Sequence, residues 1–261
     1  MIPIQFKRTT IALLTVAAIA LASANGPANA VSAAATGVKN IVLVHGAFAD
    51  GSSWSKIIPL LEAKGYKVTA VQIPLTSLDD DVAATKRAIA MQDGQVLLVG
   101  HSWGGMVIAQ AGTDAKVAGL VYVNAFAPNA GQSANDLGQG YPTPPGIKTL
   151  KASNGFLWLP PAAVAEYFAQ DLPRSETEVM AATQGPIAAA SFGAKVSGAA
   201  WQTKPSWYTV GKQDNMINPD LERAMAKKIK ATTLELDSSH VPMLSQPEKI
   251  ASFIATAAAS L

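Results

Sequence analysis

The most constraining feature of the sequence is an apolar run that ends at a serine between glycines. Residues 95–105 read Gln-Val-Leu-Leu-Val-Gly-His-Ser-Trp-Gly-Gly, and residues 106–110 continue as a helical pattern. The apolar run predicts a buried parallel strand. Gly100 and Gly104 flank Ser102 at the spacing G-x-S-x-G of a nucleophile elbow. A strand that turns into a helix at one residue strains the backbone there, so its neighbours must lack side chains. We therefore expect Ser102 to be a nucleophile held above a helix N-terminus.

A serine hydroxyl needs a base to take its proton, so this interpretation requires a histidine and a carboxylate downstream. An ordinary glycine-rich turn would require neither. His240 follows the strand-like run 232–236, where a loop after the last strand would bring an imidazole to Ser102. Asp214 follows a strand and a glycine turn within residues 206–219, and it is the expected acid. Serine, aspartate and histidine then occur in the chain order typical of this architecture.

The chain contains other aspartate and histidine residues that could take these roles. Asp237 is an alternative acid, but it stands three residues before His240, where local geometry makes it hard to reach the ring nitrogen that faces away from the serine. His45 and His101 lie beside glycines in tight loops. For both histidines we expect a structural role rather than a catalytic one.

Acyl transfer also requires donors for the oxyanion. A second buried strand, residues 41–44, runs directly into His45-Gly46-Ala47-Phe48. An extended backbone after a glycine can direct an amide N–H at a substrate oxygen. We expect the backbone N–H groups of Ala47 and Trp103 to be these donors, with Phe48 as a less favoured substitute for Ala47.

The first thirty residues have the pattern of a signal peptide. Lys7 and Arg8 precede the apolar stretch 11–22, and Ala28-Asn29-Ala30 fits a cleavage site. The apolar stretch is shorter than the roughly twenty residues that span a bilayer, so it does not predict a stable membrane anchor. We expect cleavage near Ala30, a mature chain of residues 31–261, and a periplasmic or secreted protein.

Composition excludes several classes of partner. The chain has no cysteine, so it forms no disulfide. Its formal charge of +2 comes from Lys7 and Arg8, and the mature chain carries 18 basic and 18 acidic residues. A balanced charge without a basic run argues against nucleic acid or an anionic membrane as a partner. No histidine, cysteine and aspartate cluster has metal-ligand spacing, so we expect neither a metal nor a cofactor.

Strand and helix signals alternate along most of the mature chain, which predicts one α/β domain with a parallel sheet covered on both faces. From residue 128 to residue 204 prolines interrupt this alternation. We interpret residues 128–204 as an inserted, mostly helical cap over the active site. The expected strands are 41–44, 66–73, 96–100, 117–124 and 232–236, and the expected helices are 53–61, 78–91, 162–170, 177–183, 219–230 and 247–259.

These motifs resemble those of the α/β-hydrolase superfamily, from about Asn40 to the C-terminus. The segments 45–54 and 100–105 are similar to the branch that holds plant methyl esterases, hydroxynitrile lyases and bacterial serine esterases. The resemblance implies that Ser102, Asp214 and His240 are the nucleophile, acid and base.

The resemblance leaves the reaction to be decided. The lyases carry a threonine where this chain has Gly46 and a lysine where it has Val241. A glycine at position 46 is expected to leave room at the serine for hydrolysis. We therefore expect an exported serine esterase acting on a small-molecule ester. The alternatives are a lactonase, an amidase or a cofactor-free peroxidase with the same triad, and a ligand receptor that retains the fold.

Overall fold

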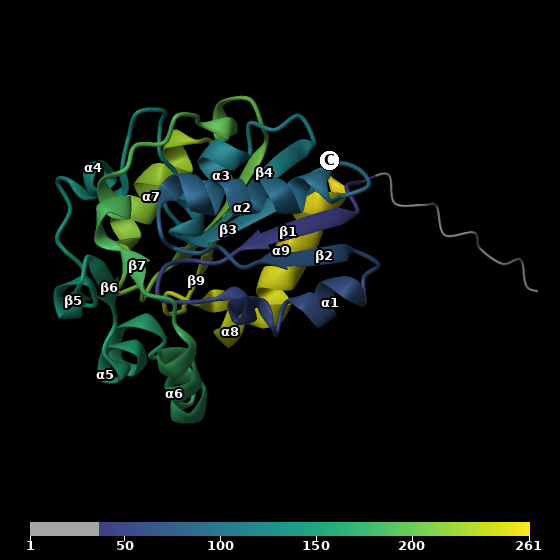
Figure 1. The fold of residues 1–261 in the computed structure, drawn as a ribbon. Helices are drawn as coiled ribbons and strands as arrows, with labels where there is room; N and C mark the ends of the chain where they lie inside the picture. Colours follow the sequence, from purple (N-terminus) through teal and green to yellow (C-terminus); the bar gives the residue numbers. More distant parts are fainter. Residues whose placement is uncertain (1–36) are drawn as a thin grey trace, which may run out of the picture. The chain divides into compact units, whose positions relative to one another are not determined.

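The structure is a computed structural model that describes residues 37–261. The signal peptide expected over residues 1–30 lies outside the described residues. A central sheet has the strand order β2-β1-β3-β4-β8-β9, and all neighbouring strands are parallel (Figure 1). The strands are β1 Asn40–Val44, β2 Lys67–Val71, β3 Val96–Ser102, β4 Val117–Ala125, β8 Ser206–Gly211 and β9 Thr232–Leu236.

Burial follows the position of each strand in the sheet. Every residue of β1, β3 and β8 is buried, which explains the apolar runs 41–44 in β1 and 96–99 in β3. The edge strands β2 and β9 are largely exposed or half-buried. The predicted parallel α/β fold is confirmed, and the candidate site residues lie in the loops after β1, β3 and β8 and after the edge strand β9.

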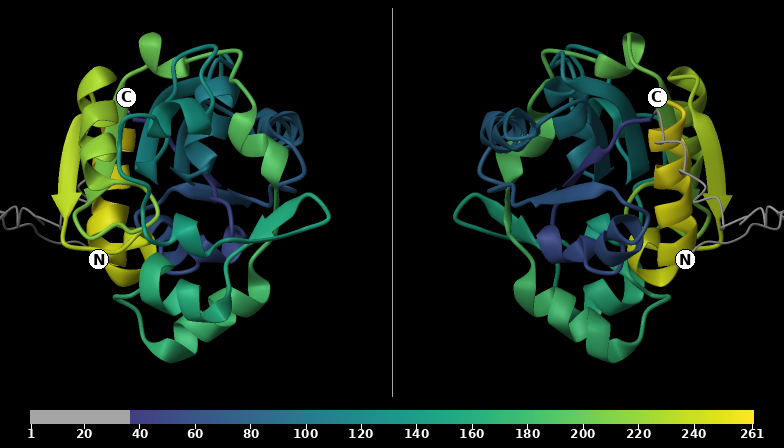
Figure 2. Two further views of the ribbon diagram at one scale, coloured as in Figure 1. Left: turned by 90° about the vertical axis from the view of Figure 1, so that its left-hand side faces the viewer. Right: turned by 90° about the vertical axis from the view of Figure 1, so that its right-hand side faces the viewer.

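Helices cover both faces of this sheet. On one face α2, Leu78–Ala90, packs against α3, Gly104–Ala111, while α9, Pro247–Ala259, packs on β3 and β4 from the other face (Figure 2). The remaining helices of the core are α1 Ile58–Glu62, α7 Pro219–Lys228 and α8 Pro242–Ser245. In residues 37–261 no helix combines the length and apolar character needed to span a bilayer.

Local signals explain where several helices begin. The Ser77 side chain accepts the N–H of Asp80 at the start of α2, and Asn218 caps α7 in the same way. The predicted helix over 53–61 is wrong in its first part. A short 3₁₀ turn, Gly51–Trp54, forms there with Asp50 as its cap, and α1 begins later, where Pro59 fits the first turn.

The segment between β4 and β8 holds the expected cap, residues 128–204. Its helices are α4 Ala134–Gly138, α5 Pro161–Ala163 and α6 Arg174–Thr183, with single turns at Ile147–Thr149, Val164–Phe168, Ala189–Gly193 and Ala200–Gln202. It also contains an antiparallel sheet, β5 Lys151–Ser153, β6 Phe156–Trp158 and β7 Ile187–Ala188.

The antiparallel sheet of the cap corrects the expectation of a mostly helical insertion. Asn154 and Gly155 connect β5 to β6 with φ of 49° and 82°. Positive φ at both central residues is the requirement of a two-residue hairpin turn, and Asn-Gly is its strongest sequence signal. That signal is present in the sequence, but the strands on either side are too short to show a periodic pattern.

The cap lies over the carboxyl ends of the parallel strands. Backbone hydrogen bonds join it to the loops after β1, β2 and β8, from Gly185 to Ala49, from Ala188 to Leu75 and from Gly146 to Asn215. Its two ends are also joined to each other, because Gly131 N–H donates to Val196 O at 2.8 Å and Val196 N–H donates to Gln132 O at 3.0 Å. These two bonds form the neck of the cap.

Candidate active site

Ser102 occupies a strained turn at the end of β3. Its φ is +52°, in the left-handed region that side chains other than glycine rarely adopt. A Cβ on Gly100 would lie 2.7 Å from the Gly104 carbonyl oxygen, and one on Gly104 would lie 2.6 Å from that of Val44. Both contacts are too short for real atoms, so glycine is required on each side of Ser102.

Asp214 and His240 meet in the loops that follow β8 and β9. His240 Nδ1 donates to Asp214 Oδ2 at 2.5 Å, and both side chains are buried. The other carboxylate oxygen, Asp214 Oδ1, accepts the backbone N–H groups of Met216 and Ile217 at 2.7 and 2.9 Å. One oxygen therefore binds backbone donors while the other binds the imidazole, which holds the carboxylate in a single orientation.

His101 connects this pair to the serine loop. Its Nε2–H donates to the His240 carbonyl oxygen at 2.9 Å, and the two rings are 4.7 Å apart. Burial, and then the nearby His240, lower the pKa of His101 well below its usual value, so the ring stays neutral. Within residues 37–261 no hydrogen bond joins Ser102 Oγ to His240. The structure thus shows the contact between Asp214 and His240, and a contact between His240 and Ser102 belongs to the proposal below.

His45 has the structural role expected of it. Its Nδ1–H donates to the Gly46 carbonyl oxygen at 2.8 Å, and its Nε2 accepts the Ile73 N–H at 3.1 Å. Both nitrogens are engaged in the neutral form, and burial lowers the pKa of the ring. The histidine ties the loop after β1 to the chain that follows β2.

The expected oxyanion donors lie in this loop and at the start of α3. In the described part of the chain, the backbone N–H groups of Ala47 and Trp103 donate no hydrogen bond within the protein, although both residues are buried. Buried N–H groups are nearly always paired, so two free donors next to Ser102 fit an anion site. The Phe48 N–H also donates no hydrogen bond within the described residues, so it stays an alternative to the Ala47 N–H.

Gly46 does not provide open space at the serine, and that expectation is wrong. A Cβ at this position would lie 2.7 Å from Ser102 Cβ and 3.0 Å from His101 Nδ1. The elbow itself fills the volume that a side chain would take. Glycine is needed here so that the loop after β1 can pack directly against Ser102.

Asn124, at the end of β4, is a site residue that the sequence did not reveal. Its φ is +43°, and its side chain is fully buried. The Nδ2 group donates to Asp214 Oδ2 at 3.4 Å and to the Ser239 carbonyl oxygen at 3.3 Å, while Oδ1 accepts the Thr209 hydroxyl. Asn124 therefore connects the acid to the loop that carries His240.

The cap also supports this loop. Asp171 Oδ2 accepts the Ser239 N–H at 2.8 Å, and Gln170 donates to the Gln213 carbonyl oxygen at 2.6 Å. The buried Phe168 ring packs edge-on against His240 with a centroid distance of 5.1 Å. The cap thus contacts both loops that hold the acid–base pair. Asp237, the alternative acid, instead lies at the surface, 3.4 Å from Lys212.

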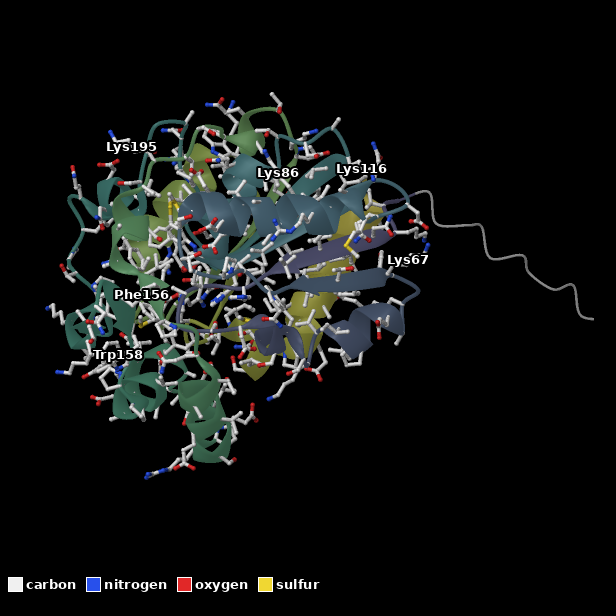
Figure 3. The ribbon with its side chains drawn as sticks, viewed as in Figure 1. Lys67, Lys86, Lys116, Phe156, Trp158 and Lys195 are labelled. Carbon is white, nitrogen blue, oxygen red and sulfur yellow. The ribbon has the colours of Figure 1, made fainter. Side chains whose placement is uncertain are left out.

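A cavity of about 550 Å³ lies between the cap and the core, and Ser102, Asp214 and His240 are not among the residues that line it. Phe126 lines it, and its N–H donates to the Ser102 carbonyl oxygen. Phe192 lines it from the cap, with its ring 5.6 Å from that of Trp103. Five other aromatic residues of the cap do not line this cavity, namely Phe156, Trp158, Tyr167, Phe168 and Trp201. Figure 3 shows Phe156 and Trp158 on the cap.

Across residues 37–261 no group of three or more histidine, cysteine, aspartate or glutamate side chains is placed to hold a metal ion. The polar groups described above instead form one connected set of hydrogen bonds around Asp214 and His240.

Comparison with known proteins places the fold. Methylesterase 2 of Arabidopsis thaliana is 27% identical over 249 residues, covering 80% of this chain and 92% of its own. An alpha-hydroxynitrile lyase from the same plant is 26% identical over 242 residues, covering 81% and 93%. The crystal structure of a pyrethroid hydrolase from Sphingobium faniae matches with a TM-score of 0.72 and 27% identity, covering 85% of this chain and 97% of that one.

These relatives include esterases and a lyase, so similarity alone does not select the reaction. The fold, in contrast, is unambiguous. A family model described as "Alpha/beta hydrolase family" matches residues 41–253, a span that begins within β1 and contains Ser102, Asp214 and His240. The chain belongs to the alpha/beta hydrolase family.

Proposed function

We propose that the protein is an exported serine hydrolase that cleaves carboxylic esters of small or medium organic molecules. The observation that supports this most is the 2.5 Å contact between His240 Nδ1 and Asp214 Oδ2. It leaves Nε2 as the one nitrogen of the ring that can serve as a base, and the His101 contact keeps that ring beside the elbow of Ser102. A base oriented by a carboxylate next to a strained serine is the arrangement that acyl transfer needs.

In the proposed reaction Ser102 Oγ attacks the ester carbonyl carbon while His240 Nε2 takes its proton. The backbone N–H groups of Ala47 and Trp103 stabilise the negative oxygen of the tetrahedral intermediate. His240 then gives the proton to the leaving alcohol, and an acyl-enzyme remains on Ser102. Water enters and repeats the two steps, which releases the acid. Asp214 orients the ring and stabilises its charged form throughout.

We infer the character of the substrate from the cavity between the cap and the core, which Phe126 connects to Ser102 through its backbone hydrogen bond. Its walls are largely apolar and aromatic, with Tyr141, Phe126 and Phe192 among them. A pocket of this kind binds the organic part of an ester by removing apolar surface from water. Relatives named as a methylesterase and a pyrethroid hydrolase support ester hydrolysis as the reaction.

The test is turnover of a panel of chromogenic esters, lactones and amides by the mature protein. We expect hydrolysis of esters, and labelling of Ser102 by a serine-directed organophosphonate located by mass spectrometry of the digested protein. Ser102→Ala is the control, and it should abolish both signals. Preferred turnover of lactones or amides would select those alternatives. Ligand binding without turnover or labelling would indicate a receptor.

A further inference from the structure

Three consecutive aspartates lie in the first turn of α2, and the third of them differs from the other two. Asp79 and Asp80 are exposed, whereas the Asp81 side chain has no exposure to solvent. The start of the helix is already capped, because Ser77 accepts the Asp80 N–H and the Asp80 carboxylate accepts the Ser77 hydroxyl. Asp81 is therefore not needed as a cap, and its two carboxylate oxygens have other partners.

Both partners of the Asp81 carboxylate are N–H groups. Oδ1 accepts the backbone N–H of Leu75 at 2.7 Å, and Oδ2 accepts the indole Nε1–H of Trp103 at 2.8 Å. Among residues 37–261 no lysine, arginine or histidine forms an ion pair with this carboxylate. A buried carboxylate without a counter-charge is stable only when hydrogen bonds replace its lost water, so the carboxylate and its two donors hold one another in place.

Trp103 is the residue whose backbone N–H is a proposed oxyanion donor. It stands between Ser102, which is strained with a φ of +52°, and two glycines, Gly104 and Gly105. Trp103 makes no side-chain capping bond at the start of α3. A strained residue relaxes where it can, and glycine has the widest choice of backbone conformations. The direction of the Trp103 N–H therefore depends on an anchor elsewhere in this residue.

The Trp103 side chain supplies this anchor. It is fully buried, its Nε1–H is bound by Asp81, and its ring lies 5.6 Å from the ring of Phe192 in the cap. A contact between rings tolerates sliding, but a hydrogen bond to a buried charged acceptor fixes both the distance and the direction of the donor. Since α2 packs against α3, Asp81 is well placed to hold the indole from the neighbouring helix.

We propose that Asp81 is a positioning residue of the oxyanion site. By holding the indole of Trp103, it keeps the backbone N–H of the same residue directed at the oxygen that becomes negative in the reaction. This role rests on the function proposed above, because it belongs to the same reaction. Asp81 itself touches no substrate, so its loss should weaken stabilisation of the tetrahedral intermediate more than binding of the ester.

The first experiment removes the indole donor. Trp103→Phe keeps an aromatic ring and the backbone N–H at this position but has nothing to offer Asp81. A displaced oxyanion donor should lower kcat on an ester about tenfold while KM changes less than about twofold. Trp201→Phe is the matched control, since the Trp201 indole also donates one hydrogen bond, to the Pro128 carbonyl oxygen at 2.7 Å, but near the end of the cap segment. Its kcat should equal that of wild type.

A transition-state analogue separates the oxyanion site from general damage to the protein. A trifluoromethyl ketone adds to the nucleophilic serine of an esterase and then carries a negative oxygen. Its inhibition constant should therefore rise in Trp103→Phe by a factor similar to the fall in kcat. The inhibition constant of the corresponding alcohol, which forms no adduct, should stay unchanged. Equal weakening of the ketone and the alcohol would contradict a role at the oxyanion.

A double-mutant cycle tests whether Asp81 acts through Trp103. Wild type, Asp81→Leu, Trp103→Phe and the double variant are assayed at pH 8, where Asp81 is ionised because burial raises its pKa only to about 6. If the two residues act as one unit, the double variant should lose no more kcat than the worse single variant. Losses that multiply would show that the two residues act independently. Thermal unfolding of each variant verifies that it is folded.

The outcomes separate this role from the proposed function. Full activity in folded Trp103→Phe, with ester hydrolysis by wild type, overturns the role of Asp81 and leaves the proposed function intact. If Asp81→Leu does not fold, Trp103→Phe and its control Trp201→Phe still decide. If the wild-type protein hydrolyses no ester, the proposed function fails and the role of Asp81 fails with it, since no oxyanion then forms.

Discussion

Asp81 on α2 accepts a hydrogen bond of 2.8 Å from the indole Nε1 of Trp103, the residue that follows Ser102. The second oxygen of Asp81 accepts the Leu75 N–H at 2.7 Å, and the side chain is fully buried. Leu75 in turn accepts the N–H of Ala188 from the cap. One carboxylate thus connects the proposed oxyanion donor to the loop on which the cap rests.

This buried carboxylate predicts a pH dependence of stability. Burial raises the pKa of Asp81 to about 6, against about 3.9 for an unfolded aspartate. Between these values the folded state binds more protons than the unfolded state, so the free energy of unfolding falls as pH rises through this window. The loss from this group amounts to about 3 kcal/mol and is complete above its folded pKa.

Urea unfolding of wild type and Asp81→Asn between pH 4 and pH 8 measures this contribution. The Asn variant does not titrate at this position, so the difference in unfolding free energy between the two proteins should change with pH across the window. Asp79→Asn, an exposed residue of the same helix, is the control and should keep the wild-type profile. Parallel profiles for wild type and Asp81→Asn would contradict the shifted pKa.

The proposed triad predicts a clear ranking of variants. Ser102→Ala, His240→Ala and Asp214→Asn should each lower kcat by roughly 10³-fold or more, because the three groups act as a unit. Asp237→Asn should lower kcat far less, since the Asp237 carboxylate lies at the surface beside Lys212. Steady-state ester hydrolysis with a thermal unfolding control gives the comparison. A larger loss in Asp237→Asn than in Asp214→Asn would assign the acid to Asp237.

The close packing of Gly46 predicts that even one methyl group is harmful there. In Gly46→Ala the new Cβ would lie 2.7 Å from Ser102 Cβ, so the loop or the elbow must move. A displaced oxyanion donor should lower kcat at least about tenfold while KM changes less. Gly94→Ala is the matched control, because its nearest neighbour, Asn40 Nδ2, would be at an ordinary 3.4 Å. Wild-type turnover by Gly46→Ala would show that this contact relaxes without consequence.

Cyanohydrin cleavage is the competing reaction on this scaffold. A departing cyanide requires a cation nearby, and the position after His240 holds Val241, an apolar side chain with 1% exposure. We expect turnover of short-chain esters and negligible cyanide from mandelonitrile, measured on one preparation of enzyme. Rapid cyanide release without ester hydrolysis would reverse the assignment.

Export is tested on the protein in its native host. The sequence predicts a mature N-terminus near Val31. This follows from the basic residues near the N-terminus, the apolar stretch 11–22 and the expected cleavage site Ala28-Asn29-Ala30. Mass spectrometry of the periplasmic or extracellular protein should find that terminus. An intact Met1 on a protein confined to the cytosol would refute export.

Sequence reasoning succeeded where the signal was local. Residues close together in the sequence determine β3, the turn at Ser102 and α3. The positions of these elements could therefore be predicted from the sequence. Asn124 could not be found in this way. It contacts Asp214 only because the end of β4 packs against the loop after β8, and an isolated asparagine in a sequence carries no sign of such packing.

The neck of the cap, formed by Gly131, Gln132 and Val196, defines which piece of this enzyme can be exchanged. Since β4 and β8 are parallel, the chain must return along the sheet before β8 begins, and residues 197–205 connect the neck to the start of β8. Replacing all of 128–204 would cut it. The two ends of residues 132–196 are joined by the hydrogen bonds of the neck. Recombination can therefore replace this segment while β4, β8 and the chain between the neck and β8 stay unchanged. In the present protein Asp171 of the cap accepts the Ser239 N–H. A replacement segment would need an acceptor at the same place, because otherwise the loop that carries His240 would lose this hydrogen bond.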